Sequence, residues 1–240
     1  KKGSLLYMSG LPRKLTDIDK HLVEIFSQNV QIAFDNVLLN KDIEDTQREI
    51  IERLADAMET SFGSQNHTKR MVKICEILGR AAGLSKDELK TLCLAVPLHD
   101  IGKINISDNI MLNPGSLDKE EMGKARSHAE IGYSLLRDSN RPLIKFAALI
   151  ARDHHEYWNG KGYPRGKSGE GIHIFCRITS LADAFDAMRT QRSYKEAWPL
   201  EKVMEVIHAE KGQQFDPRLV DLLQDNIEEI EAIMQEFSTP

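Results

Sequence analysis

The chain has 240 residues, of which 41% are hydrophobic and 29% are charged, a balance that is ordinary for a globular protein with one sizeable core. Its net charge of −5 gives no general attraction to nucleic acid, so an anionic ligand would need a local group of basic side chains. No apolar run is long enough to span a membrane and no signal-peptide pattern opens the chain, so we expect a cytoplasmic protein that binds neither membrane nor nucleic acid.

The three cysteines, Cys75, Cys93 and Cys176, are odd in number and lack CxxC spacing. Each lies among apolar residues, which predicts buried free thiols in a reducing compartment. The sequence begins with Lys1 rather than Met, and we expect it to be part of a longer chain.

A long helix is predicted near the N-terminus. The short apolar run Leu5-Leu6-Tyr7-Met8 before it is compatible with a lone strand or a disordered tail. Thr16 followed by Asp19 has the spacing of a capping box, and neither proline nor glycine follows until Gly63. A helix or helix pair of this length exceeds what a compact domain usually uses, so we predict that residues 1–48 form a linker or signalling helix.

One series of residues spaced seven positions apart along this helix contains two asparagines. The series is Leu22, Asn29, Asn36, Ile43, Ile50 and Ala57. Buried asparagines can fix the register of a two-stranded coiled coil, so one interpretation is a parallel homodimer. The other is that the asparagines are solvated and the helix packs against its own domain. The sequence leaves both interpretations open.

For residues 49–240 the pattern predicts an all-α helical bundle. Ser85 with Glu88 and Asp118 with Glu121 have capping-box spacing, and we expect the helix that starts at Asp118 to run through His128. Alternating strand patterns are nearly absent. In each predicted helix a candidate metal ligand lies on the apolar face or directly after the last apolar residue of that face. The combinations are His67 with Met71, Ile74 and Leu78, His99-Asp100 after Leu92 and Val96, His128 with Ile131 and Leu135, His154 with Ala147 and Ile150, and Asp183 with Ile178, Leu181 and Phe185. Helical bundles build metal sites from inward-facing side chains in this way.

The adjacent residues His99 and Asp100 place an imidazole and a carboxylate at one point of the backbone. Such a pair can bind one metal ion while the carboxylate bridges to a second, and His154-His155 could complete that second site. Neutral imidazoles together with carboxylates suit Fe, Mn, Co, Ni or Zn better than Mg or Ca. Two-metal sites of this kind hydrolyse phosphate esters with an activated water.

Each candidate also has a purely structural interpretation. A lone histidine such as His67 on an apolar face is more often a hydrogen-bonded core residue than a ligand. Asp183 needs a partner on such a face, because burial of an unpaired charge costs several kcal/mol, and a metal ion would be such a partner. His21, His173 and His208 match no motif, and we interpret them as structural or solvent-exposed.

Several motifs occur in one order along the chain. They are Asn66-His67-Thr68-Lys69-Arg70, His99-Asp100-Ile101-Gly102-Lys103, His128 with Ile131-Gly132, His154-His155-Glu156 running to Gly162-Tyr163-Pro164, Asp183-Ala184-Phe185-Asp186 running to Arg192-Ser193-Tyr194-Lys195, and Phe215-Asp216-Pro217. In this order they resemble the HD-GYP family, the bacterial metal-dependent phosphodiesterases that hydrolyse cyclic di-GMP. The resemblance spans about Ala55 to Phe215 and implies an HD-domain helical bundle.

The resemblance implies two divalent transition-metal ions, with iron or manganese expected in the cell. One ion would be held by His67, His99, Asp100 and Asp183, and the second by Asp100, His128, His154 and His155, with Asp100 bridging. A hydroxide between the ions would attack phosphorus in line, giving pGpG, GMP or both. Lys103, Arg192 and Lys195 would bind the phosphates, with Asp100 and Lys103 at the catalytic centre.

The resemblance also suggests partners. The loop Gly162-Tyr163-Pro164 is a candidate docking site for a GGDEF-type or other signalling protein. The N-terminal part resembles the last strand and final helix of a GAF-type sensor module, of which only the tail would be present.

Three positions depart from the family pattern. Gly63 stands where some members have a glutamate that binds a third metal, so we expect two metals. Asn159 replaces a usual aspartate, which keeps the side-chain shape and a hydrogen-bonding carbonyl but loses the charge. His173 stands where proline is usual, and we regard this change as neutral.

Two other classes of function stay open. The protein could be a catalytically silent receptor for cyclic dinucleotides or a protein-docking module, although such proteins normally lose metal ligands. It could also be a related HD phosphohydrolase that acts on another nucleotide such as cyclic GMP–AMP. The motifs do not separate cyclic di-GMP from cyclic GMP–AMP.

Overall fold

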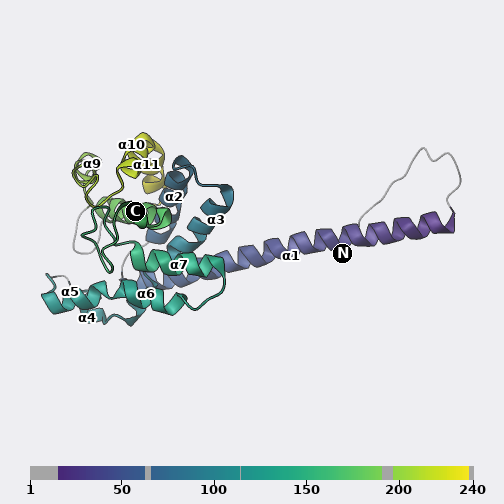
Figure 1. The fold of residues 1–240 in the computed structure, drawn as a ribbon, viewed down its shortest axis with the longest axis horizontal. Helices are drawn as coiled ribbons and strands as arrows, with labels where there is room; N and C mark the ends of the chain where they lie inside the picture. Colours follow the sequence, from purple (N-terminus) through teal and green to yellow (C-terminus); the bar gives the residue numbers. More distant parts are fainter. Residues whose placement is uncertain (1–15, 63–65, 114, 191–196, 238–240) are drawn as a thin grey trace. The chain divides into compact units, whose positions relative to one another are not determined.

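The computed structural model describes residues 16–62, 66–113, 115–190 and 197–237. By its internal contacts the chain divides into two units, Lys1–Ile50 and Ile51–Pro240. The described residues are mostly helical and contain no β-strand (Figure 1), which confirms the predicted all-α fold. The apolar run Leu5-Leu6-Tyr7-Met8 lies outside the described residues.

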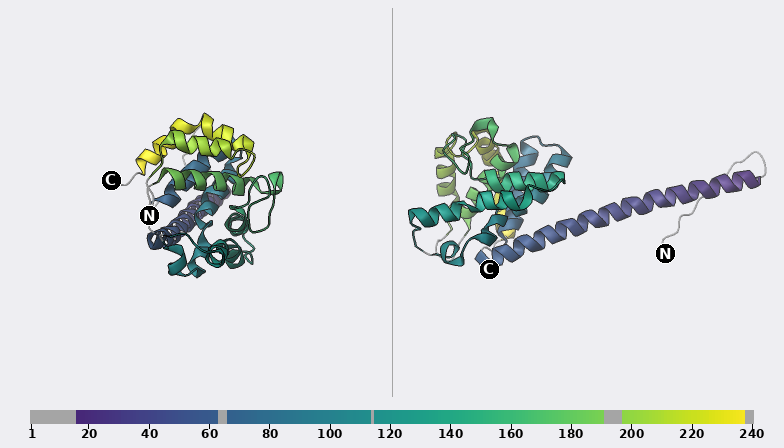
Figure 2. Two further views of the ribbon diagram at one scale, coloured as in Figure 1. Left: turned by 90° about the vertical axis from the view of Figure 1, so that its left-hand side faces the viewer. Right: turned by 60° about the horizontal axis from the view of Figure 1, so that its bottom comes forward.

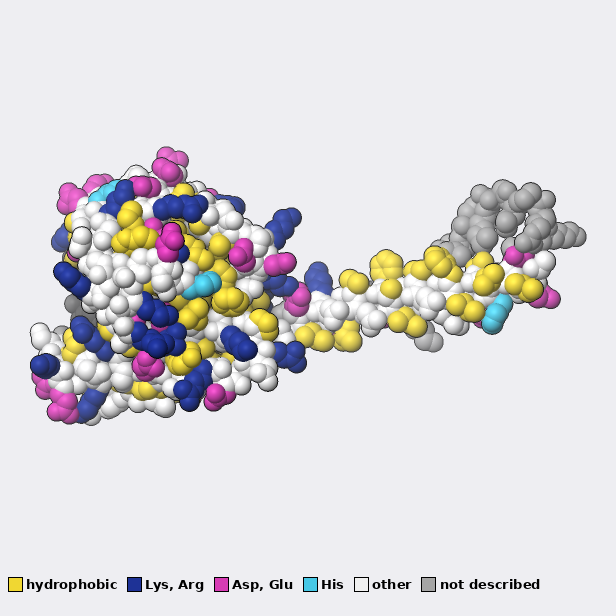
Figure 3. Space-filling model, viewed as in Figure 1, with side chains coloured by type: hydrophobic (Ala, Val, Ile, Leu, Met, Phe, Trp, Pro, Cys, Tyr) yellow, Lys and Arg dark blue, Asp and Glu magenta, His cyan; other side chains and the backbone are white. Residues whose placement is uncertain are grey.

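In its described part, the first unit is a stretch of a single helix, α1 (Asp17–Phe62), which continues into the second unit. The capping box predicted at Thr16 is present: its backbone N–H donates to the Asp19 carboxylate at 2.8 Å, and the Asp19 N–H donates to Thr16 Oγ1 at 3.2 Å. Most side chains between residues 17 and 50 are exposed, including Leu22 and Phe34, and Figure 3 shows hydrophobic side chains along this helix.

The second unit is a bundle of short helices. They are α2 (His67–Ala81), α3 (Lys86–Ala95), η1 (Val96–Leu98), η2 (Ile101–Asn105), α4 (Asp108–Met111), α5 (Lys119–Arg126), α6 (His128–Leu136), α7 (Pro142–Asp153), η3 (Gly169–Gly171), α8 (Ile174–Arg189), α9 (Leu200–Ala209), α10 (Pro217–Asp225) and α11 (Ile227–Glu236). Helix α8 packs against α2, α7, α9 and α10, and α7 also packs against α3 and α6 (Figure 2). Helix α8 is therefore central to the bundle.

The core of this unit includes the apolar faces predicted around His67, Leu92, Ile150 and Leu181, but the prediction was wrong for Leu135, which is 52% exposed. Its fully buried side chains include Met71, Ile74, Leu78, Leu92, Ile150, Phe175, Ile178, Leu181, Phe185, Ile207 and Leu219. The capping boxes predicted at Ser85 and Asp118 are both formed, each with reciprocal hydrogen bonds to the glutamate three residues on. Local caps thus fix where these helices start, and the apolar stripes fix which faces are inside.

The helix predicted to run from Asp118 through His128 is in fact two helices. Helix α5 ends at Arg126, and the Ser127 hydroxyl donates to the Lys124 carbonyl at 2.6 Å. A serine hydroxyl that bonds the backbone in this way competes with helix continuation, and α6 then starts at His128. The break puts His128 at a helix start, facing the other histidines.

Cys75 and Cys176 are buried free thiols as predicted, whereas Cys93 is only half-buried, so the prediction was wrong for that residue. Burial raises the pKa of both buried thiols.

In the described part of the chain, the helices lack the combination of length and apolar character that crossing a membrane requires.

Candidate metal centre

Six of the predicted ligands lie in two compact groups inside the second unit. His67, His99 and Asp183 form one group, and His128, His154 and His155 form the other, with ligand atoms within 4.8 Å of one another in each. His67 begins α2, His99 follows η1, His128 begins α6, His154 directly follows α7, and Asp183 lies in α8. Residues more than one hundred positions apart are therefore brought together by the packing of the bundle.

Three histidines of the two groups have one ring nitrogen held by a backbone carbonyl. Nδ1 of His99 lies 2.9 Å from the Val96 carbonyl oxygen, Nδ1 of His128 lies 2.6 Å from that of Ala125, and Nδ1 of His154 lies 2.9 Å from that of Ile150. Because a carbonyl oxygen only accepts, Nδ1 carries a proton, and Nε2 is the nitrogen that is left to bind a metal ion. This orientation by a backbone carbonyl is typical of metal-binding histidines.

The free nitrogens are buried and unsatisfied. Nε2 of His99, His128 and His154 and Oδ1 of Asp100 make no hydrogen bond with the described residues, although each is shielded from solvent. Buried polar atoms without partners are rare and costly, so a cluster of them needs an explanation. Imidazole nitrogens and a carboxylate oxygen that converge in this way fit a site for divalent transition-metal ions.

The Asp100 carboxylate lies between the two groups. Its Oδ1 is 3.4 Å from His128 Nε2 and 3.9 Å from His154 Nε2, whereas its Oδ2 is 3.3 Å from His99 Nε2. Each oxygen thus faces a different group, which is the arrangement that a bridging ligand requires. Lys103 Nζ also pairs with Asp100 Oδ2, so the cation predicted to bind phosphate contacts the proposed bridge.

The electrostatics of the site favour ligand forms of these residues. Burial lowers the pKa of His154 to about 3, and it also lowers the pKa of His128 and His155. Burial opposes ionisation of Asp100 too, but Lys103 and His99 outweigh it and hold the Asp100 pKa well below its usual range. At neutral pH the second group therefore offers neutral imidazoles beside an ionised carboxylate.

For His99 the balance differs. Burial disfavours its charged form, but the adjacent Asp100 carboxylate outweighs burial and raises the pKa of His99 to about 9. In the form without metal, a proton on His99 thus partly neutralises Asp100. A cation in the same place would serve the same electrostatic purpose.

Asp186, which had no site role in the sequence interpretation, orients His67. It is 1% exposed, and its Oδ2 lies 2.7 Å from His67 Nδ1. Arg70 donates from Nε to Oδ1 at 2.5 Å and from Nη2 to Oδ2 at 3.1 Å. Burial raises the pKa of Asp186, but these hydrogen bonds outweigh it and lower the pKa overall. The spacing from Asp183, three residues along the same helix, was the available sequence signal.

The loop after His155 is held against the histidine backbone. The buried Glu156 carboxylate accepts the N–H groups of Arg165 at 2.7 Å and Lys167 at 2.9 Å. A Cβ on Gly162 would lie 2.5 Å from the His155 carbonyl oxygen, so only glycine fits this close approach. The loop that carries Tyr163 is therefore positioned by Glu156 and Gly162 relative to the metal ligands.

The remaining predicted residues fall in three places. Asn159 accepts the Lys161 N–H through Oδ1 at 2.9 Å and donates to Gln213 at 3.2 Å, so its amide shapes the turn without contacting the ligands. His173 caps α8 and accepts the Phe175 N–H at 3.2 Å, a structural role as predicted. Gly63, Arg192 and Lys195 lie outside the described residues.

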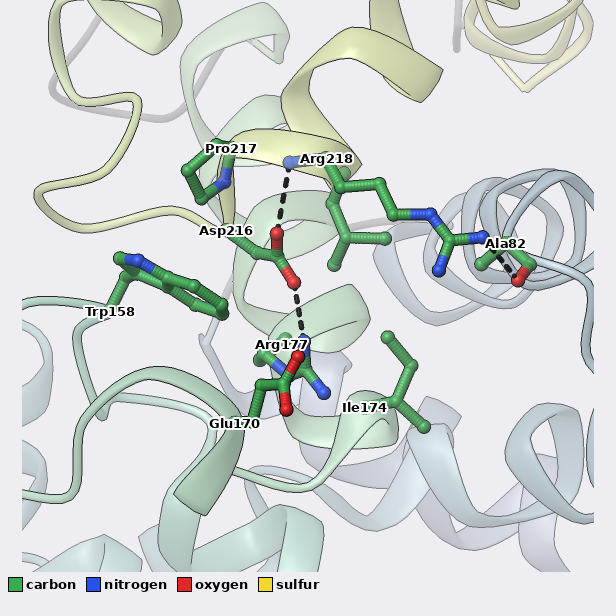
Figure 4. Close-up of a pocket in the computed structure, with 9 residues that line it drawn as sticks. Ala82, Trp158, Glu170, Ile174, Arg177, Asp216, Pro217 and Arg218 are labelled. Carbon is green, nitrogen blue, oxygen red and sulfur yellow. Dashed lines mark hydrogen bonds and ion pairs between the residues drawn. The ribbon is translucent and has the colours of Figure 1, made fainter.

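A separate pocket of about 460 Å³ lies apart from these ligands (Figure 4). Asp216 at its centre accepts from Arg177 Nη1 at 2.5 Å and from the Arg218 N–H at 2.9 Å, and Arg218 also donates to the Ala82 carbonyl at 2.9 Å. These bonds join α2, α8 and α10. The Phe215-Asp216-Pro217 motif is therefore explained by helix capping and packing.

Comparison with known proteins assigns the fold. Residues 49–219 match the family model described as "HD domain". The chain belongs to the HD domain family. The family membership expected from the sequence is thus confirmed. Residues 1–43 match a model described as "Domain of unknown function (DUF3369)", and the GAF-type origin of this segment stays a prediction.

The chain is similar to several curated proteins. It is 40% identical over 231 residues to "3'3'-cGAMP-specific phosphodiesterase 2" of Vibrio cholerae, and the alignment covers 96% of this chain and 44% of that protein. It is 41% identical over 199 residues to "Cyclic di-GMP phosphodiesterase response regulator RpfG" of Xanthomonas campestris pv. campestris, covering 82% of this chain and 53% of that protein. The chain thus spans about half the length of these relatives.

A solved structure of a cyclic GMP-AMP specific phosphodiesterase of V. cholerae, V-cGAP3, has the same fold. It superposes with a TM-score of 0.58 at 22% identity, covering 80% of this chain and 51% of that one.

Proposed function

We propose that this HD domain is a metal-dependent phosphodiesterase that hydrolyses cyclic di-GMP to pGpG, GMP or both. The observation that carries the proposal is the convergence of His99, His128 and His154 Nε2 atoms around the Asp100 carboxylate, all buried and unsatisfied. The similarity to proteins named cyclic di-GMP phosphodiesterases supports the choice of substrate.

In this proposal His67, His99 and Asp183 hold one divalent ion, His128, His154 and His155 hold another, and Asp100 bridges. When bound, such a pair of ions supplies a nucleophilic water at neutral pH and stabilises charge on the phosphoryl oxygens. The backbone carbonyls and Asp186 keep the imidazoles in the metal-binding tautomer. Iron or manganese is the expected metal.

Lys103 is proposed to bind a phosphate oxygen beside Asp100, and the family resemblance adds Arg192 and Lys195. The Lys103 side chain is 26% exposed, so it is accessible to a ligand as well as to Asp100. Its role is electrostatic stabilisation of the charge that develops on phosphate during hydrolysis.

The test is product analysis. Protein loaded anaerobically with Fe²⁺ or Mn²⁺ is incubated with cyclic di-GMP, and the products are separated by chromatography while elemental analysis reports metal content. We expect pGpG or GMP from the loaded protein. No product from protein that holds two reduced ions per chain would favour a catalytically silent receptor instead.

Lys103→Ala separates the enzyme from the receptor. In an enzyme it should lower turnover by about 10²–10³-fold and leave metal content unchanged, because only transition-state charge stabilisation is lost. In a receptor the intact dinucleotide would bind saturably, and the substitution would change affinity alone.

Cyclic GMP–AMP is the second candidate substrate. The similarity to a protein named as specific for that nucleotide extends over 96% of this chain and favours testing it. Parallel assays with both dinucleotides at matched concentrations compare the two values of kcat/KM directly.

The assembly is part of the same proposal. Residues 1–48 act as a linker or signalling helix and residues 49–240 as the catalytic domain of a cytoplasmic homodimer, joined through α1 as a parallel pair. Exposed apolar side chains such as Ile25 and Ile32 support this pairing. A GGDEF-type or other signalling protein is proposed to dock on Gly162-Tyr163-Pro164.

A further inference from the structure

A row of rings leads outward from the second group of histidines. The His155 ring lies 5.1 Å from the His128 ring and stacks on Tyr163 at 4.7 Å with an interplanar angle of 28°. Tyr163 is the outermost ring of this row, and the guanidinium of Arg126 lies 5.0 Å from its centre. The row therefore connects a proposed metal ligand to a cation at the surface.

Arg126 is placed there by two independent features. It is the last residue of α5, and the break at Ser127 starts α6 at His128, so the cation and the ligand are close in sequence and on adjoining helices. Tyr163 is placed by the loop that Glu156 and Gly162 hold against His155. Arg126 is thus held close to the ligand His128 through the α5–α6 junction, and Tyr163 is held close to the ligand His155 through the loop that follows it.

The charge of Arg126 is available to a ligand. Its side chain is exposed, and within the described residues it forms no ion pair with a carboxylate. Other cations near the ligands differ in this respect, because Lys103 pairs with Asp100 and Lys167 pairs with Asp153 at 2.7 Å. The cation–π contact with Tyr163 holds the guanidinium near the ring without using its N–H groups, which can still donate hydrogen bonds.

We propose that Arg126 is a substrate-binding residue that grips the phosphate of the cyclic dinucleotide that is not being cleaved. A cyclic dinucleotide carries two phosphates, and only one can occupy the metal centre at a time. A guanidinium one stacked ring beyond His155 is suited to bind the other through paired N–H donors. This inference rests on the proposed function and adds a contact remote from the reacting phosphorus.

The experiment compares two substrates. Cyclic di-GMP has a second phosphate, whereas bis(p-nitrophenyl) phosphate is a diester with only the scissile one. Arg126→Ala should lower kcat/KM for cyclic di-GMP roughly ten- to hundredfold, mainly through KM, because a charge-assisted contact is lost. Turnover of the small diester and metal content should change less than twofold. Arg126→Lys should retain part of the affinity for cyclic di-GMP, because lysine keeps the positive charge but lacks the paired N–H donors of the guanidinium.

Lys124→Ala is the matched control, because Lys124 lies on the same helix, is exposed and pairs with Glu120 at 2.6 Å. It should leave both substrates unaffected. If Arg126→Ala lowers kcat/KM equally on both substrates, or loses metal, Arg126 only positions the metal centre and the proposal is wrong. An unchanged kcat/KM for cyclic di-GMP would also overturn it.

Calorimetric titration of cyclic di-GMP into the metal-loaded protein distinguishes the two proposals. If the wild type binds without turnover, the proposed activity fails but the same loss of affinity in Arg126→Ala still supports the contact. If the wild type cleaves the small diester yet neither binds nor cleaves cyclic di-GMP, the proposed substrate is wrong and the Arg126 contact is rejected with it.

Discussion

Substitution of Asp186 by asparagine tests whether the metal site depends on the residue that orients His67. Asp186→Asn keeps the shape of the side chain but removes its charge. The amide oxygen can still accept from Arg70, but the amide N–H₂ group then faces His67 Nδ1. Donation to Nδ1 would move the ring proton to Nε2, which is the atom needed for the metal.

Two magnitudes follow from this geometry. Loss of a partner that orients a ligand typically costs 10–100-fold in metal affinity, so one ion per chain should bind that much more weakly. Arg70, which is 3% exposed, also loses this carboxylate, and breaking a buried ion pair from one side costs about 3–5 kcal/mol of stability. The same substitution should therefore weaken metal binding and lower the free energy of unfolding.

The assays separate these effects. Competition with a chelator followed by elemental analysis gives metal affinity, and urea unfolding of the metal-free protein gives stability. Arg70→Gln is the matched control, because it breaks the same ion pair but leaves a carboxylate on His67, so stability should fall more than metal affinity. Asp186→Asn with wild-type metal affinity would refute the orienting role of Asp186.

Four further predictions concern the proposed bridge, the packing of Gly102 and the assembly of the N-terminal helix. Asp100→Ala should remove most of both ions, because its two oxygens face different histidine groups, and elemental analysis showing full metal content would exclude a bridge. Gly102→Ala should destabilise the fold by about 3 kcal/mol or more, since its Cβ would lie 1.9 Å from the His128 carbonyl oxygen, and an unchanged melting temperature would contradict this close packing. Light scattering should give twice the mass of one chain, and a monomer at high concentration would reject the dimer. Replacing Asn29 and Asn36 together by isoleucine should raise the oligomeric order above two, because buried asparagines favour two-stranded coils.

Much of the fold could be predicted because its signals are local. The caps at Thr16, Ser85 and Asp118 depend on residues three positions apart, and all three are formed. The apolar stripes predicted the buried faces of α2, α7 and α8 for the same reason, since helical periodicity is a property of the sequence itself. The break at Ser127 was missed because a serine inside a helix is compatible with either outcome until packing decides.

The candidate site divides in the same way. The sequence identified the ligand types, the His99-Asp100 pair and the family, because these depend on residue identity and spacing alone. The tertiary structure decided which distant atoms face one another: the two oxygens of Asp100 lie toward separate groups, Nδ1 of His67 lies toward the Asp186 carboxylate, and Arg126 lies over Tyr163. The contacts of Asp100 with His128, of His67 with Asp186 and of Arg126 with Tyr163 join residues far apart in the sequence, so they exist only once the apolar faces of the helices are packed together.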